Sequence, residues 1–184
     1  MVILGISGSL RRDSHNSMLL RAAGAELPEG VELRLFEGLR DVPPYDEDDD
    51  HDPAPAAVTR LREALAGADA LLVATPEYNS SIPGQLKNAL DWASRPRATS
   101  PLMFHPVAVI GASTGSFGAV WAQAELRKVL AASGARVVEG DLAVGHAHDR
   151  IGADGTLVDD DQRTRLRELL HLLVSEIRPV EIAA

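Results

Sequence analysis

The sequence predicts an α/β domain in which helices cover both faces of a parallel β-sheet. Short apolar, partly β-branched runs alternate with longer segments of helical periodicity, which is the pattern of strand–helix–strand units. Apolar residues make up 45% of the chain and charged residues 24%, as in ordinary packed proteins. The length of 184 residues suits one such domain, and neither a repeat nor a linker interrupts it. We therefore expect residues 1–184 to form a single domain.

The first half of the chain contains three predicted strands and two predicted helices. An apolar run at 2–7 is the first strand, and leucine and alanine recur on one side of a helix over 16–27. Residues 31–36 alternate apolar and polar side chains, as expected for a half-exposed edge strand. A second helix is expected over 54–66, and 70–74 reads as a short buried strand.

The next predicted elements are a helix, a strand and another helix. Pro83 suits the first residue of a helix over 83–94, because its missing N–H is not needed there. The apolar run at 106–112 is the fourth strand. A helix is expected over 117–133, with Gly134 at the usual position after a helix end.

The last predicted elements are an irregular strand and a strongly amphipathic helix. A fifth strand begins at 136–138 and is expected to continue irregularly towards Val144. The helix over 161–177 carries one leucine-rich stripe, and Asp159–Asp161 complement its positive end. Parallel crossovers are right-handed in nearly all proteins, which restricts the strand order. We expect the order 2-1-3-4-5, one of the two common orders for this fold class.

This strand order brings the loops after strands 1, 3 and 4 together at the carboxyl edge of the sheet, where open parallel sheets bind ligands. The first of these loops, 8–17, offers hydroxyls, side-chain amides, two guanidinium groups and the free N–H groups of a helix start. That combination suits a phosphate group. The loop matches neither the dinucleotide pattern G-x-G-x-x-G nor the P-loop pattern. The alternative interpretation is a polar helix cap with two surface arginines.

The other two loops differ in character. Residues 75–84 are stiffened by Pro76 and Pro83, and Tyr78 and Asn79 are suited to pack against a flat ring and bond to its polar edge. The same residues are equally compatible with a simple strand end and helix start. Residues 111–118 are mostly small, which allows a ligand to approach the backbone closely.

Composition excludes several classes of function. The chain has no cysteine, so disulfides, thiolate metal sites and a cysteine nucleophile are excluded. A net charge of −9 makes nucleic acid an unexpected partner. No segment approaches the roughly 20 apolar residues of a membrane helix, and the first residues lack a signal-peptide pattern. We expect a cytoplasmic protein without a membrane partner.

Hydrolase and metal sites are not expected either. No G-x-S-x-G nucleophile elbow occurs. The acidic run at 46–52 lacks the glycine and terminal glutamate of an EF-hand loop, so we interpret it as solvated surface. His146 and His148 lie two residues apart without a further evident ligand, and we predict no metal there.

Three segments together resemble the NAD(P)H-dependent FMN reductase family, which includes quinone, azo-dye and chromate reductases. They are GSLRRDSHN from Gly8, TPEYNSSIPGQLKNALDWAS from Thr75 and ASTGSFGAVWAQAELRKVL from Ala112. Pro43–Asp46 and the Asp154–Gly155 pair are similar as well, so the resemblance spans nearly the whole chain.

The resemblance implies a flavodoxin-like three-layer fold with bound FMN. It places the FMN phosphate on Ser9, Arg11, Ser14 and Asn16, with Ser17 nearby. It places the isoalloxazine ring against Pro76, Glu77, Tyr78 and Asn79, with Ser113 and Gly115 completing the ring site.

The implied activity is hydride transfer from NADPH or NADH through FMN to a small acceptor: a quinone, an azo compound, a flavin or a metal oxyanion. The flavin carries the chemistry, so ping-pong kinetics without an indispensable catalytic residue are expected. Glu77 is a candidate for proton handling; the alternative is that its carboxylate bonds to loop amides. The resemblance also implies a homodimer or homotetramer with the third and fourth helices near the interface.

One position departs from the family pattern. Where the family commonly has arginine in its third motif, this chain has Trp121, between Ala119 and Gln123. An aromatic side chain there favours stacking of aromatic acceptors such as quinones. Two other functions fit the same sheet: an electron carrier of the flavodoxin type, and a binding or regulatory module without flavin.

Overall fold

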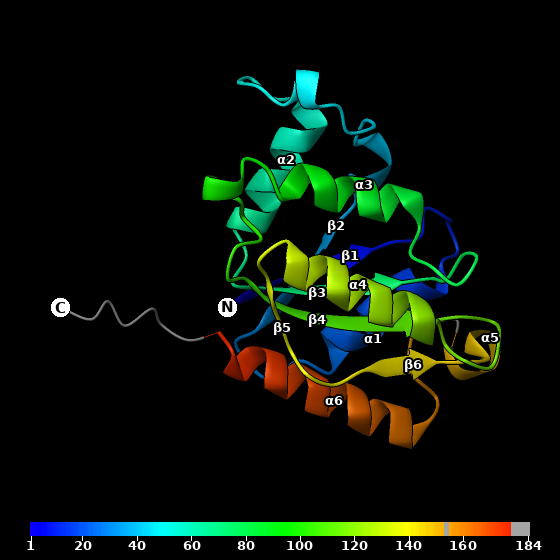
Figure 1. Ribbon diagram of the computed structural model, residues 1–184. Helices are drawn as coiled ribbons and strands as arrows, with labels where there is room; N and C mark the ends of the chain where they lie inside the picture. Colours follow the sequence, from blue (N-terminus) through cyan, green and yellow to red (C-terminus); the bar gives the residue numbers. More distant parts are fainter. Residues whose placement is uncertain (153–154, 178–184) are drawn as a thin grey trace.

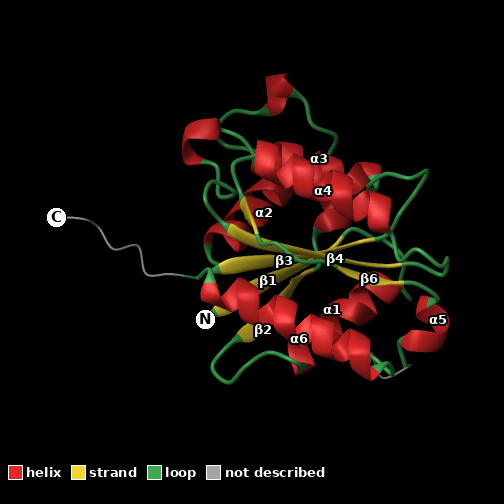
Figure 2. Ribbon diagram, turned by 60° about the horizontal axis from the view of Figure 1, so that its bottom comes forward, coloured by secondary structure: helices red, strands yellow, loops and turns green. Residues whose placement is uncertain are grey.

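A parallel β-sheet lies between two layers of helices in the computed structural model, which describes residues 1–152 and 155–177 (Figure 1). The strand order is β2-β1-β3-β4-β5, and β6 also pairs with β4. Helices α1 and α6 cover one face, whereas α2, α3 and α4 cover the other (Figure 2). The predicted order and layering are confirmed. Asp154, one of the residues in the resemblance, lies outside the described residues.

The strands run parallel throughout this sheet. They are β1 (Val2–Ser7), β2 (Glu32–Phe36), β3 (Ala70–Thr75), β4 (Pro106–Ala112), β5 (Arg136–Val137) and β6 (Leu142–Val144). Every residue of β3 and β4 is buried, because helices cover both faces of the central strands. In β2 exposed and half-buried side chains largely alternate, which confirms the predicted edge strand.

The helices follow the predicted pattern with small shifts at their ends. They are α1 (His15–Ala25), α2 (Ala56–Ala66), α3 (Gly84–Ala93), α4 (Val120–Ala132), α5 (Ala147–Arg150) and α6 (Asp160–Ser175), with short 3₁₀ turns η1 (Leu39–Asp41), η2 (Glu47–Asp49) and η3 (Arg97–Thr99). Pro83 is the residue before α3 rather than its first residue, because its ψ of 137° is extended. Among the described helices, none has the length and apolar character needed to cross a bilayer.

The start of α4 differs from the prediction. The helix begins at Val120, three residues later than expected, because Gly118 and Ala119 adopt left-handed conformations with φ of 58° and 63°. A Cβ atom on Gly118 would lie 2.5 Å from the carbonyl carbon of Ala143. The turn therefore passes directly against β6, and this packing delays the helix.

The predicted irregular fifth strand is confirmed; it consists of two short strands, β5 and β6, that both pair with β4. β5 pairs with the beginning of β4 and β6 with its end. Gly140, with φ of 118°, lies between them. At the start of α6, the Asp159 carboxylate accepts hydrogen bonds from the amides of Asp161 and Gln162, as the charge pattern predicts.

Candidate functional site

The loops after β1, β3 and β4 converge as predicted and enclose a pocket of about 150 Å³. We call it the three-loop pocket. It is lined by Ser9, Arg11, Ser14, His15, Asn16, Pro76, Glu77, Tyr78, Ala112, Ser113 and Thr114. Eight of these are predicted site residues, while Ser17, Asn79 and Gly115 do not line it. The topology of the sheet therefore gathers most of the predicted site.

The first loop presents the amino-terminal end of α1 to this pocket. Ser14 is the N-cap residue, and its hydroxyl accepts a hydrogen bond of 3.3 Å from the Ser17 amide. The first amides of a helix have no intrahelical partner. Helix α1 lies wholly within the described residues, and its first turn contains no acidic side chain. Arg11 adds a guanidinium group whose Nη2 donates to the Asp13 carbonyl at 2.9 Å. This end of the pocket attracts anions.

The Asn16 side chain is fully engaged with the backbone at the end of β4. Its Nδ2 donates to the Ala112 carbonyl at 3.0 Å, and its Oδ1 accepts from the Ala112 amide at 2.9 Å. The side chain is buried. Asn16 therefore fastens the first loop to the fourth strand, and its backbone amide is the group that remains for a ligand.

His15, the first residue of α1, is a site residue that the sequence did not single out. Its Nδ1 atom is buried and has no hydrogen-bond partner within the described residues. Burial, followed by the charges of Arg11 and His148, lowers the pKa of His15 below its ordinary value. His15 therefore lines the pocket as a residue, while its Nδ1 atom is turned into the protein. In the sequence, the one feature that could have indicated His15 is its position directly after Ser14, a residue type that favours helix caps.

The second loop is a tight turn. Tyr78 and Ser81 exchange two backbone hydrogen bonds of 3.0 and 3.1 Å, and Asn79 and Ser80 between them have positive φ angles. Asparagine tolerates this conformation better than most residues. Asn79 forms the exposed tip, while the Tyr78 ring is half exposed beside the pocket.

Glu77 links the second loop to the start of α4. One carboxylate oxygen accepts hydrogen bonds of 3.1 Å from the amides of both Trp121 and Ala122. The N-cap residue of α4 is Ala119, which carries no side-chain acceptor. Glu77 thus caps a helix that belongs to a different loop, in agreement with the interpretation that its carboxylate bonds to amides.

The third loop is held by Ser113 and the segment after β6. The Ser113 hydroxyl accepts from the Gly115 amide at 3.1 Å, and the Ser113 amide donates to the Val144 carbonyl at 3.0 Å. A Cβ atom on Gly145 would lie 2.2 Å from the Ser116 carbonyl oxygen. The backbones meet closely here, which keeps the loop edge of the pocket fixed. Gly115 itself does not line the pocket, and its amide is bonded to the hydroxyl of Ser113.

Ser17 and the histidine pair lie elsewhere. The Ser17 hydroxyl bonds to that of Ser7 at 3.0 Å and lines a different pocket. The rings of His146 and His148 are 6.3 Å apart, and no group of metal ligands occurs in residues 1–152 and 155–177.

Comparisons with known proteins extend this description. The model of the NADPH-dependent FMN reductase family matches residues 1–149. An NAD(P)H-dependent FMN reductase of Pseudomonas aeruginosa is 41% identical over 177 residues, covering 96% of this chain and 95% of the relative. A 2-hydroxy-1,4-benzoquinone reductase of Burkholderia is 38% identical, covering 94% of each chain.

Solved structures agree with these relatives. The flavoenzyme NAD(P)H:(acceptor) oxidoreductase of Paracoccus denitrificans superimposes with a TM-score of 0.84 at 34% identity, covering 96% of each chain. A flavodoxin of Pseudomonas aeruginosa, at 18% identity and a TM-score of 0.59, covers 95% of this chain and 99% of its own. The second similarity concerns the fold alone and confirms that it is flavodoxin-like.

Proposed function

The chain belongs to the NADPH-dependent FMN reductase family, and we propose that it transfers electrons from a nicotinamide nucleotide to quinones through FMN held in the three-loop pocket. The observation that carries this proposal is the convergence of three loops on one pocket with an anion-attracting helix end on one side. FMN, when bound, supplies the chemistry by accepting hydride and passing on the electrons. The protein supplies position and electrostatics.

The residues of the first loop fit the FMN phosphate. The free amides at the start of α1, the Ser9 hydroxyl and the Arg11 guanidinium are the donors that a phosphate dianion needs. Ser14 acts indirectly, because its hydroxyl holds the first turn of α1 in place.

The residues of the second and third loops fit a flat ring. Pro76, Tyr78 and Ser113 supply the lining of the pocket from these two loops. Glu77 acts as a positioning residue, because its carboxylate fixes the second loop relative to α4. We assign no acid or base to the reaction: proton exchange with solvent suffices at an open site.

The exposed aromatic residues favour a quinone as the acceptor. The Trp121 ring is 49% exposed and meets Phe117 edge to face at 4.9 Å. The Glu77 carboxylate, which lines the three-loop pocket, binds the backbone amide of Trp121. The Burkholderia relative, whose alignment covers 94% of each chain, is a 2-hydroxy-1,4-benzoquinone reductase. We expect Trp121→Arg to lower turnover of a quinone relative to chromate; unchanged quinone turnover would remove the support for this assignment.

We also propose a homodimer formed through α4. Phe117, Val120 and Trp121 form an exposed apolar patch at the start of this helix, and self-complementary apolar patches are typical of two-fold interfaces. A charge at the centre of such a patch prevents association. Val120→Glu is therefore expected to give a monomer by light scattering, whereas the control Val158→Glu, at a more exposed valine outside the patch, keeps the dimer.

The experiment that tests the central proposal is an anaerobic titration. The purified protein should show flavin absorbance, lose it when NADPH is added, and recover it when a soluble quinone follows. A flavin spectrum that NADPH does not bleach would instead indicate an electron carrier. A protein that takes up no FMN would refute the assignment of the three-loop pocket.

A further inference from the structure

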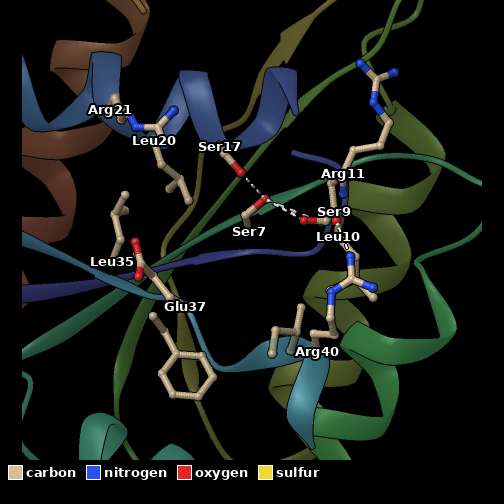
Figure 3. A pocket seen from close by; sticks show the side chains of 13 residues that line it. Ser7, Ser9, Leu10, Arg11, Ser17, Leu20, Arg21, Leu35, Glu37 and Arg40 are labelled. Atoms are coloured by element: carbon tan, nitrogen blue, oxygen red, sulfur yellow. Dashed lines mark hydrogen bonds between the residues drawn. The ribbon is translucent and has the colours of Figure 1, made fainter. Parts of the chain in front are cut away.

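The Arg40 side chain connects η1 with the first loop of the three-loop pocket. Its Nη2 atom donates a hydrogen bond of 2.6 Å to the Leu10 carbonyl. Figure 3 shows the side chain extending from η1 toward Leu10, with Ser9 and Arg11 close by, at the edge of a second pocket of about 170 Å³. Leu10 lies between Ser9 and Arg11, the two side chains proposed for the FMN phosphate. Arg40 does not line the three-loop pocket, so it contacts the first loop from outside that pocket.

This hydrogen bond orients the peptide group between Leu10 and Arg11. The peptide is trans, and in a planar trans peptide the carbonyl and the N–H point in opposite directions. The Leu10 carbonyl is held by Arg40, while the Arg11 amide on the other edge donates to the Ser9 hydroxyl at 3.4 Å. A hydroxyl that accepts a hydrogen bond keeps its own O–H for another acceptor. The peptide orientation therefore leaves the Ser9 O–H available to a ligand.

The turn that carries Arg40 is itself fixed to α3. The Gln85 Nε2 atom donates to the carbonyls of Leu39 and Val42, each at 2.8 Å. Both of these residues have buried side chains. Arg40 therefore reaches the first loop from a rigid base, and its hydrogen bond restrains the loop rather than the turn.

The Pro43–Asp46 segment, which resembles the family in sequence, extends this attachment to α3. The Pro43 carbonyl accepts hydrogen bonds from the Asn88 side chain at 2.7 Å and from the Trp92 indole at 2.9 Å. The Asn88 side chain also accepts from the Tyr45 amide at 2.7 Å. Helix α3 begins after the second loop of the pocket. Residues 39–45 thus couple the helix that follows the second loop to the first loop.

The charge of Arg40 is uncompensated where it meets the first loop. Arg40 forms no ion pair within residues 1–152 and 155–177. Glu37 lines the same second pocket, but Figure 3 shows it on the far side from Arg40. Hydrogen bonds in a chain polarise one another, so a guanidinium on the Leu10 carbonyl strengthens the N–H donor of the same peptide. In a chain of net charge −9, this cation favours a phosphate on the first loop.

We propose that Arg40 is a positioning residue for the FMN phosphate. It holds the Leu10–Arg11 peptide in the orientation that phosphate binding needs, and it places a positive charge behind that peptide. This inference rests on the proposed function, because it requires FMN in the three-loop pocket with its phosphate on the first loop. Affinity for FMN then depends on Arg40, whereas electron transfer through the bound flavin does not.

The test measures the dissociation constant of FMN by diluting the holoprotein and following the fluorescence of released flavin. Arg40→Met keeps the aliphatic stem and removes the charge and the N–H donors. It should raise the dissociation constant about tenfold, as for the loss of one hydrogen bond from a charged donor. Arg40→Lys retains a charge and a donor and should recover part of the affinity.

Arg60→Met is the matched control. Arg60 contacts the same turn through an exposed ion pair of 3.6 Å with Asp41, and it lines none of the pockets beside the first loop. Exposed ion pairs contribute little to stability. The control therefore removes the same charge without touching the Leu10–Arg11 peptide, and it should bind FMN as the wild type does.

Two further measurements separate positioning from a general effect on the fold. In Arg40→Met saturated with FMN, the phosphorus NMR resonance of the bound coenzyme should shift, while kcat with a quinone stays at the wild-type value. An unchanged dissociation constant and resonance, or an equal loss in Arg60→Met, would overturn the inference. So would a joint fall in kcat and in the urea midpoint of the FMN-free protein without recovery in Arg40→Lys, because that pattern indicates a purely structural role. A wild-type protein that binds no FMN would refute the proposed function itself, and this inference with it.

Discussion

Replacing Glu77 by alanine removes the acceptor that caps α4 from the neighbouring loop. The carboxylate takes two hydrogen bonds of 3.1 Å from the amides of Trp121 and Ala122. Loss of a side-chain cap costs about 1 kcal/mol, and loss of a negative charge at a helix start adds about 0.3–1 kcal/mol. The side chain is half exposed, so we expect a decrease of about 1–2 kcal/mol in the free energy of unfolding.

The same change loosens the loop that carries Tyr78, so FMN binding should weaken along with stability. Urea denaturation of the FMN-free protein measures the first effect, and fluorescence titration with FMN measures the second. Glu77→Gln keeps an acceptor oxygen and loses only the charge, so about half of the destabilisation is expected. Glu125→Ala, on the exposed face of the same helix, serves as the control and should change neither quantity.

The pH profile of the reduction separates positioning from proton transfer. If Glu77 positions the loop, Glu77→Gln lowers FMN affinity but leaves the shape of the profile with saturating FMN unchanged. A variant of normal stability and normal FMN affinity that loses one limb of the profile would refute the capping argument. It would restore the carboxylate as a proton-transfer group.

Three further predictions follow from the structure. Asn16→Ala should lower the free energy of unfolding by about 2–3 kcal/mol in urea titrations, because both polar groups of Ala112 lose their buried partner; a smaller loss than that of an exposed asparagine variant would contradict the structural role. Burial lowers the pKa of His105, so the folded state resists protonation and stability should fall as pH drops below the unfolded value of 6.5; His105→Gln should flatten this fall between pH 7 and pH 5 in thermal melts, and an equally steep fall would show that other groups cause it. Gly118→Ala should lower the free energy of unfolding by about 1–3 kcal/mol, because φ is 58° and the added Cβ would lie 2.5 Å from the backbone of Ala143. An unchanged melting temperature would mean that β6 shifts to make room for the Cβ atom.

The sequence predicts the central strands well because their signals are local. β1 and β4 have the predicted bounds, since each is an apolar run that ends where small or polar residues begin. The start of α4 was predicted wrongly. The left-handed turn at Gly118 and Ala119 arises from packing against β6, a contact that no local pattern encodes.

The candidate site shows the same division. Loop composition indicates the three-loop pocket, because each loop by itself contains polar or small residues at a strand end. The roles of individual residues in this pocket could not be predicted from the sequence, because they depend on distant parts of the chain. Asn16 bonds to a residue 96 positions away, and Glu77 caps a helix 44 positions away.

The two bonds between Asn16 and Ala112 have a consequence for biogenesis. The three-loop pocket is incomplete until residue 112 has been synthesised and β4 has docked beside β3 with its end against Asn16, after more than half of the polypeptide has left the ribosome. The coenzyme can then stabilise the finished protein, but it cannot serve as a template for the early steps of folding.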